Sequence, residues 1–101
     1  MSSSLTSHVA DDGNQLTIKI HGRFDFNLHK PFREAYKGMS GVNEYVIDLS
    51  AAEYLDSSAL GMLLLLREHA GEGTAIRVVG CNDEIRKIFT ISNFDRLFSL
   101  S

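Results

Sequence analysis

The stretch that decides the fold is YVIDLSAAEYLDSSALGMLLLL, residues 45–66. It opens with a strand-like apolar segment and closes with the apolar run 62–66. Between these two segments, Ser57 and Ser58 directly follow Asp56. Asp and Ser are favoured at a helix N-cap because their side-chain oxygens accept hydrogen bonds from the unpaired N–H groups of the first turn. We therefore expect a strand, a short loop and a helix that opens at the two serines.

The start of this helix also suits a phosphate. Its unpaired N–H groups lie at the positive end of the helix macrodipole, which stabilises an anion placed there. A phosphate on Ser57 or Ser58 would fit, although capping alone is the commoner role for such residues. From the residues alone, a structural cap and a phosphorylation site both remain open.

Upstream, the sequence predicts a hairpin and a helix. Residues 5–10 and 15–21 flank the turn cluster Asp11-Asp12-Gly13-Asn14, whose glycine and asparagine tolerate positive φ. Apolar residues recur at helical spacing over residues 28–36 and form one stripe. Pro31 then falls in the first turn of the helix, where its missing N–H costs least.

The helix after the serines is apolar on nearly all sides. Leu60, Leu63 and Leu64 are expected to form the inner stripe that faces the core. Met62, Leu65 and Leu66 project away from this stripe. They either complete the core, which is the commoner fate, or remain exposed as a patch that receives a partner.

The remaining segments complete an alternation of strands and helices. Residues 75–79 show little alternation of polarity and predict a strand covered on both faces. Asp83 is expected to cap the next helix and Asn93 to close it, before residues 94–100 end the chain in a short strand. The pattern predicts one α/β domain over residues 1–101, with a mixed sheet of about four or five strands and helices packed largely on one face.

Three segments carry a family resemblance: IKIHGRFD at residues 18–25, DSSALG at residues 56–61 and AIRVVG at residues 75–80. They resemble the STAS family, in particular its single-domain antagonists of bacterial anti-sigma factors, and they imply the STAS fold. In that family the phosphoacceptor is the serine directly after the Asp of the motif. This position corresponds to Ser57, with Ser58 as the second choice.

The resemblance implies a signalling protein without catalysis of its own. Unphosphorylated, it would bind an anti-sigma factor with serine-kinase activity, and phosphorylation would release that partner. A PP2C-type phosphatase would reset the serine, and ATP would be a ligand of the kinase, so no cofactor is expected in this chain. The implied partner surface consists of Asp25, Asp56, Ser57, Ser58, Met62 and Leu65. Asp25 would orient the Ser57 hydroxyl or contact the kinase, and a plain turn or cap role for it is about equally plausible.

Composition sets limits on other functions. The chain has 101 residues, 44% of them hydrophobic, and a net charge of −3 without an evident basic stripe, which argues against nucleic-acid binding. Cys81 is the only cysteine, so we expect no internal disulfide and a small buried side chain. No apolar run approaches the length of a bilayer span, and we expect a soluble cytoplasmic protein without membrane insertion.

Motifs for catalysis or metal binding are absent from the sequence. There is no G-x-S-x-G nucleophile elbow, and the four histidines lack the spacing of a zinc site, so neither an enzyme nor a metal centre is expected. The main alternative to the phosphorylation switch is a fixed adaptor subunit, because STAS domains also accompany lipid and anion transport machinery. In that case Ser57 would be only a cap. The two adjacent hydroxyls favour the switch.

Overall fold

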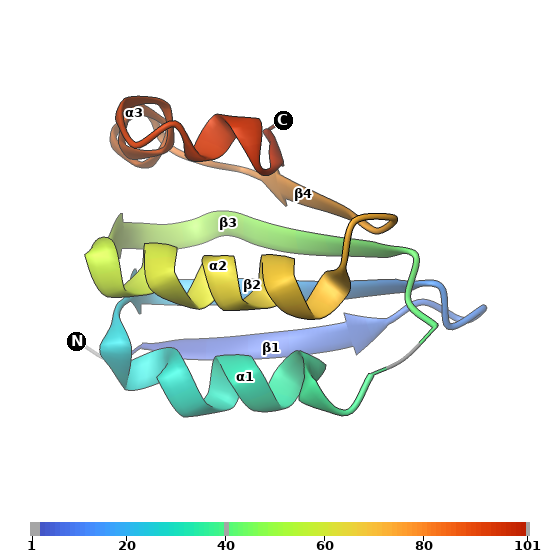
Figure 1. The fold of residues 1–101 in the computed structure, drawn as a ribbon. Coiled ribbons are helices and arrows are strands. Elements are labelled where there is room, and N and C mark those ends of the chain that lie inside the picture. The colour runs from blue at the N-terminus through green and yellow to red at the C-terminus, as the bar shows by residue number, and fades with distance from the viewer. Residues whose placement is uncertain (1–2, 40, 101) are drawn as a thin grey trace.

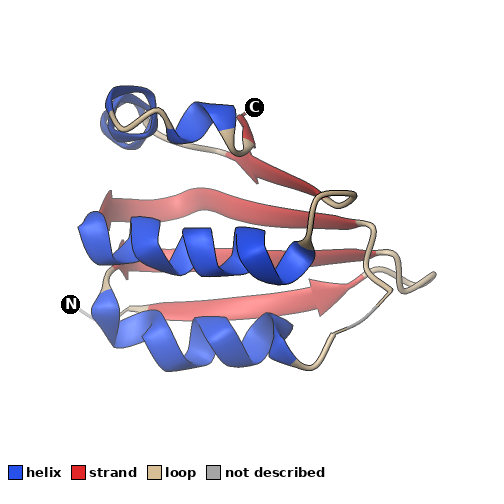
Figure 2. Ribbon diagram, viewed as in Figure 1, coloured by secondary structure: helices blue, strands red, loops and turns tan. Residues whose placement is uncertain are grey.

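The computed structural model describes residues 3–39 and 41–100. The elements, in chain order, are β1 (Ser4–Val9), β2 (Gln15–Phe24), η1 (Phe26–Leu28), α1 (His29–Lys37), β3 (Glu44–Leu55), α2 (Ser57–Ala70), β4 (Ala75–Val79), α3 (Asp83–Ile91), η2 (Phe94–Arg96) and β5 (Ser99–Leu100). The strands form one sheet in the order β1-β2-β3-β4-β5, and α1 and α2 lie side by side over one face of it (Figure 1). The predicted α/β fold, with helices on one face, is confirmed (Figure 2).

The sheet is mixed because only its first connection is a hairpin. β1 pairs antiparallel with β2, while the neighbouring pairs from β2 to β5 are all parallel. The Ala10 N–H donates to the carbonyl oxygen of Gln15 at 2.9 Å across the predicted turn, where Gly13 has a φ of +75°. Parallel strands need crossover connections, and α1, α2 and α3 supply the three that this sheet requires.

One face of the sheet carries the core and the other has no helix over it. Along β2, Leu16, Ile18 and Ile20 are at most 1% exposed, and the residues between them are half-buried and polar. The predicted burial of both faces of residues 75–79 is wrong, because Arg77 and Val79 lie half-buried on the open face. The alternation in β4 escaped notice since Val79 is apolar although it does not face the core.

The open face mixes polar and charged side chains with Val46 and Val79. Asp48 in β3 accepts a hydrogen bond from the Ser50 N–H at 2.9 Å. Burial acts to raise the pKa of the Asp48 carboxyl, but the Ser50 hydrogen bonds and the charges of Lys19 and His21 outweigh burial and lower it. The charged form of this carboxyl is therefore favoured on the open face.

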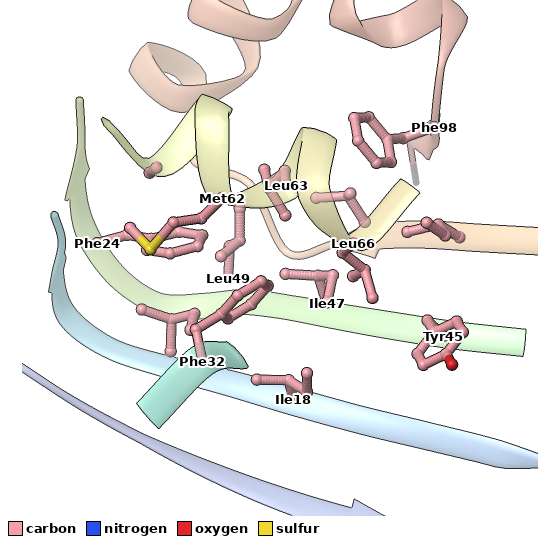
Figure 3. Packing of buried hydrophobic residues seen from close by; sticks show 14 of the residues in the cluster. Ile18, Phe24, Phe32, Tyr45, Ile47, Leu49, Met62, Leu63, Leu66 and Phe98 are labelled. Atoms are coloured by element: carbon pink, nitrogen blue, oxygen red, sulfur yellow. The ribbon is translucent and has the colours of Figure 1, made fainter. Parts of the chain in front are cut away.

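The inner face of α2 differs from the one predicted. Ala59, Met62, Leu63 and Leu66 are at most 3% exposed and pack against the strands (Figure 3). The predicted stripe was right for Leu63 and in part for Leu60, which is half-buried and packs against the core, and wrong for Leu64, which is 39% exposed. Because α2 is apolar nearly all round, several stripes fit its sequence, and only packing on the sheet selects one.

The C-terminal elements follow the prediction with one shift at a helix start. Asn82, and not Asp83, caps α3, because its side-chain oxygen accepts the Ile85 N–H at 2.8 Å. Asn93 closes the helix as expected, in the left-handed conformation with a φ of +63°. The final strand is confirmed as β5, which pairs with β4. In residues 3–39 and 41–100, every helix is too short or too polar to cross a membrane.

Gly80 directly follows β4 and lies close to Ser50 of β3. Its φ is +76°, a region that glycine adopts without steric cost. A Cβ atom built at this position would lie 2.7 Å from the backbone nitrogen of Ser50 and 2.8 Å from its Cβ. Gly71, at the C-terminal end of α2, has a similar φ of +80° but no atom within 4 Å of such a Cβ.

We expect Gly80→Ala to destabilise the fold more than Gly71→Ala. Both variants carry the cost of an L-residue in a positive-φ conformation that side chains rarely adopt, about 1–3 kcal/mol. Only Gly80→Ala adds overpacking against Ser50, about 1–3 kcal/mol more. Urea unfolding measures the free energy of unfolding of both variants. If both lost the same amount of stability, β3 would be able to shift at Ser50 without cost.

Candidate functional site

The candidate site lies where β2 and β3 end together. β3 continues to Leu55, so only Asp56 separates it from α2, and the predicted short loop is absent. The strands stay paired up to Phe24 and Leu55 because register shifts near Lys19 and Gly22 let β2 follow the longer β3. The Asp56 N–H also donates to the Phe24 carbonyl oxygen at 3.4 Å. The residues that follow both strands therefore meet at one edge of the sheet.

Asp56 is the N-cap of α2, as the sequence predicts. Its Oδ1 accepts hydrogen bonds from the Ser58 N–H at 3.0 Å and the Ala59 N–H at 3.2 Å. The same oxygen accepts the Ser58 hydroxyl at 2.5 Å. One carboxylate thus satisfies two unpaired donors of the first turn and also holds the neighbouring side chain.

The two serines consequently differ in their surroundings. Ser58 is half-buried and its hydroxyl is committed to Asp56. Ser57 is exposed, and within the described part of the chain its hydroxyl has no hydrogen-bond partner. A modifying enzyme would therefore reach the Ser57 hydroxyl without first breaking a contact of the fold.

Asp25 caps η1 at the matching end of β2. Its Oδ1 accepts the Asn27 N–H at 3.0 Å, and its Oδ2 lies 3.6 Å from the Arg23 Nε. The Arg23 guanidinium in turn lies over the Tyr54 ring, 5.1 Å from its centroid, which links the ends of β2 and β3. The Asp25 carboxylate is thus occupied by η1 and Arg23.

The surface beside these caps includes apolar side chains, only some of which could be assigned from the sequence. Met62 is 3% exposed and Leu66 is fully buried, so a place for them on an exposed patch is wrong, while Leu65 is exposed as the patch requires. Phe26 was not among the predicted residues, yet it is 66% exposed and stacks on His29 with ring centroids 4.9 Å apart. An aromatic residue directly after the strand-ending Asp25 was the available signal.

The described residues contain no cluster of three His, Cys, Asp or Glu side chains that could hold a metal ion. Cys81 is half-buried and packs against the core. Burial raises the pKa of its thiol, with the Arg86 charge acting in the opposite direction, so this cysteine is a poor nucleophile. The chemistry available at the candidate site is that of the exposed Ser57 hydroxyl and the half-buried carboxylates of Asp25 and Asp56.

Comparisons with known proteins find relatives over nearly the whole chain. A family model described as "Mlab, STAS domain" matches residues 7–100. A STAS-domain containing protein of Pseudomonas aeruginosa is 53% identical over 97% of this chain and 99% of its own length. The anti-sigma-F factor antagonist RsfB of Mycobacterium tuberculosis is 30% identical over 96% of this chain and 81% of its own length.

Solved structures share the fold. An anti-sigma factor antagonist from Mycobacterium paratuberculosis superposes with a TM-score of 0.82 at 24% identity, covering 98% of this chain and 85% of its own. A sulfate transporter family protein from Wolinella succinogenes gives a TM-score of 0.74 at 14% identity, covering 88% and 73%. The same architecture therefore occurs in proteins with different names and settings.

We expect Asp56→Ala to lower the free energy of unfolding by about 0.5–2 kcal/mol, because two N–H groups of α2 lose their acceptor. Ser57→Ala is the matched control and should stay within about 0.5 kcal/mol of the wild type, since it is exposed and its hydroxyl makes no contact. Urea unfolding measures both variants. If Ser57→Ala lowered the free energy of unfolding as much as Asp56→Ala, the Ser57 hydroxyl would be part of the cap.

Proposed function

This chain belongs to the STAS domain family, and from that membership we propose that it is an anti-sigma factor antagonist switched by phosphorylation of Ser57. The observation that carries the proposal is the difference between the two serines: Ser57 is exposed with an unoccupied hydroxyl, whereas Ser58 is held by Asp56. The relative named anti-sigma-F factor antagonist, at 30% identity, supports the assignment.

In this proposal the unphosphorylated protein binds its partner through the edge where β2 and β3 end. The surface there comprises Asp25, Phe26, the start of α2 and the exposed Leu65. Partner binding at this edge keeps the anti-sigma factor away from its sigma factor. The chain itself has no catalytic role, and the bound anti-sigma factor supplies the kinase activity.

A phosphate on Ser57 would change this surface and leave the fold intact. It adds roughly −1.5 to −2 charges at pH 7. Because Asp56 already occupies the N–H groups of Ser58 and Ala59, the phosphate lies outside the cap and not within it. A partner carboxylate about 4 Å away would be repelled by about 1 kcal/mol in water and about 4 kcal/mol at an effective dielectric of 20.

That repulsion is large enough for a switch. Each 1.4 kcal/mol corresponds to about a tenfold change in affinity, so the complex would weaken by roughly one to three orders of magnitude. A PP2C-type phosphatase would restore binding by removing the phosphate. The expected setting of this cycle is transcription control in the cytoplasm.

The second candidate function is a fixed adaptor in a transport complex. The likeness to a sulfate transporter family protein favours it, because this fold occurs there as well. In an adaptor, Ser57 is an exposed residue in the first turn of α2 that is never phosphorylated, so the charge at this end of the helix stays constant.

The proposal predicts that phosphate is found on Ser57 and not on Ser58. Intact-mass measurement and site mapping of protein isolated from its native cell test this directly. Ser58→Ala should leave the modification largely in place, since that hydroxyl only contacts Asp56, whereas Ser57→Ala should abolish it. Phosphate mapped to Ser58 would contradict the assignment.

It further predicts that Ser57→Ala binds the partner permanently and that Ser57→Asp binds it more weakly. Asp carries one charge and fewer acceptor oxygens than phosphate, so its effect should be the smaller. Titration of both variants against the anti-sigma factor that co-purifies with Ser57→Ala measures the affinities. Circular dichroism should be unchanged because an acid is tolerated at a helix N-terminus. Equal affinities would favour the adaptor.

A further inference from the structure

We propose that the groove between α1 and α2 docks an acidic segment of the partner protein. The proposal rests on the partner binding proposed above and adds the chemical character of the surface that is recognised. Its first support is the charge on α1. Lys30, Arg33 and Lys37 follow one another at spacings of three and four residues, which places them on one side of the helix. All three are exposed, on a chain whose net charge is −3.

The second support is a hollow of about 380 Å³ between the two helices. It is lined by His29, Arg33, Tyr36, Lys37, Leu65 and His69. A second hollow of about 330 Å³ continues along the outer side of α1 and shares three of these residues, adding Lys30 and Glu34. Glu34 is the only acidic residue in the lining of either hollow. The two together form a basic groove, which we define by the residues named here.

The floor of the basic groove is apolar. Tyr36 is 5% exposed, and its ring centroid lies 5.0 Å from that of His69 on α2. Burial raises the pKa of the Tyr36 hydroxyl, while the charge of Arg33, which lines the same hollow, acts to lower it. Leu65 is 47% exposed and forms an apolar lip on the α2 side.

This combination fits a protein segment that carries carboxylates around an apolar side chain. The carboxylates would pair with Arg33 and Lys37, and the apolar side chain would cover Leu65 and the edge of Tyr36. An anionic membrane is a poorer occupant because a flat bilayer surface does not enter a hollow between two helices. Charge complementarity therefore favours an acidic protein segment over a lipid surface.

The basic groove lies on the same helix pair as the proposed switch. α1 and α2 run alongside each other and both begin near the edge of the sheet where Asp25 and Asp56 lie (Figure 1). The groove reaches α2 at Leu65 and His69, about two to three helical turns beyond Ser57. It is therefore a contact separate from the phosphorylation site, and screening weakens the effect that a phosphate on Ser57 has on it.

A peptide titration followed by amide chemical shifts tests the groove. The probe is a short synthetic peptide that alternates Glu with Leu, and its control carries Lys in place of every Glu. We expect the acidic peptide to shift amides of α1 and of the Leu65 to His69 turn, and the basic peptide to shift none. The variant Arg33→Glu/Lys37→Glu should weaken binding about tenfold.

The matched control is Arg86→Glu/Lys87→Glu, which makes the same charge change on the exposed surface of α3. Its affinity should stay within about twofold of the wild type, because screening limits the reach of a distant exposed charge. Equal losses in the two double variants would overturn the proposal, since attraction would then depend on net charge alone. Stronger binding to phosphatidylglycerol vesicles than to the peptide, lost in the groove variant, would also overturn it.

A second variant keeps the test decisive if the charge reversals disturb α1. Leu65→Ala on α2 removes the apolar lip without changing any charge, and it should weaken the acidic peptide several-fold. Unchanged affinity for this variant would reject the groove as the docking site. The outcome is separable from the phosphorylation switch: phosphate on Ser57 without peptide binding rejects the groove alone, and peptide binding without phosphate rejects the switch alone.

Discussion

The parallel pairing of β2 with β3 up to Phe24 and Leu55 is the constraint on which the rest of the molecule depends. Because parallel strands end at the same edge, the chain leaves the sheet twice at adjacent points, once at Asp25 and once at Asp56. Each departure needs a cap, and each cap starts a helix that returns across the same face. The site, the helix pair and the core between helices and sheet all follow from this shared edge.

Local signals explain why much of this architecture could be predicted. The hairpin needs only a turn cluster between two alternating segments, and the cap needs only an Asp placed before a helix. The end of β3 could not be predicted because the strand extends beyond residue 49 through its pairing with β2, and register shifts in β2 depend on both strands. Likewise, the inner face of α2 has no signature in a segment that is apolar on every side.

In the candidate site, too, some features could be predicted from the sequence and others depend on the folded structure. The sequence shows two adjacent hydroxyls after Asp56, but it does not show how they differ. The difference appears in the fold, where the Asp56 carboxylate accepts a hydrogen bond from the Ser58 hydroxyl and the Ser57 hydroxyl makes none. Met62 was misplaced because its burial depends on the packing direction of α2. The cations of α1 repeat at spacings of three and four residues, so the absence of an evident basic stripe was wrong for this helix. The hollow beside these cations could not be predicted, because it needs α2 to place Leu65 and His69 next to them.

The bare face of the sheet has an evolutionary consequence. Thr17 and Lys19 are half-buried on the face without helices, whereas Ile18 and Ile20, one position along, lie in the core. Within a single strand, alternate positions should therefore diverge at very different speeds. The face without helices can change its side chains at less cost to folding than the core face can, because fewer packing contacts depend on them.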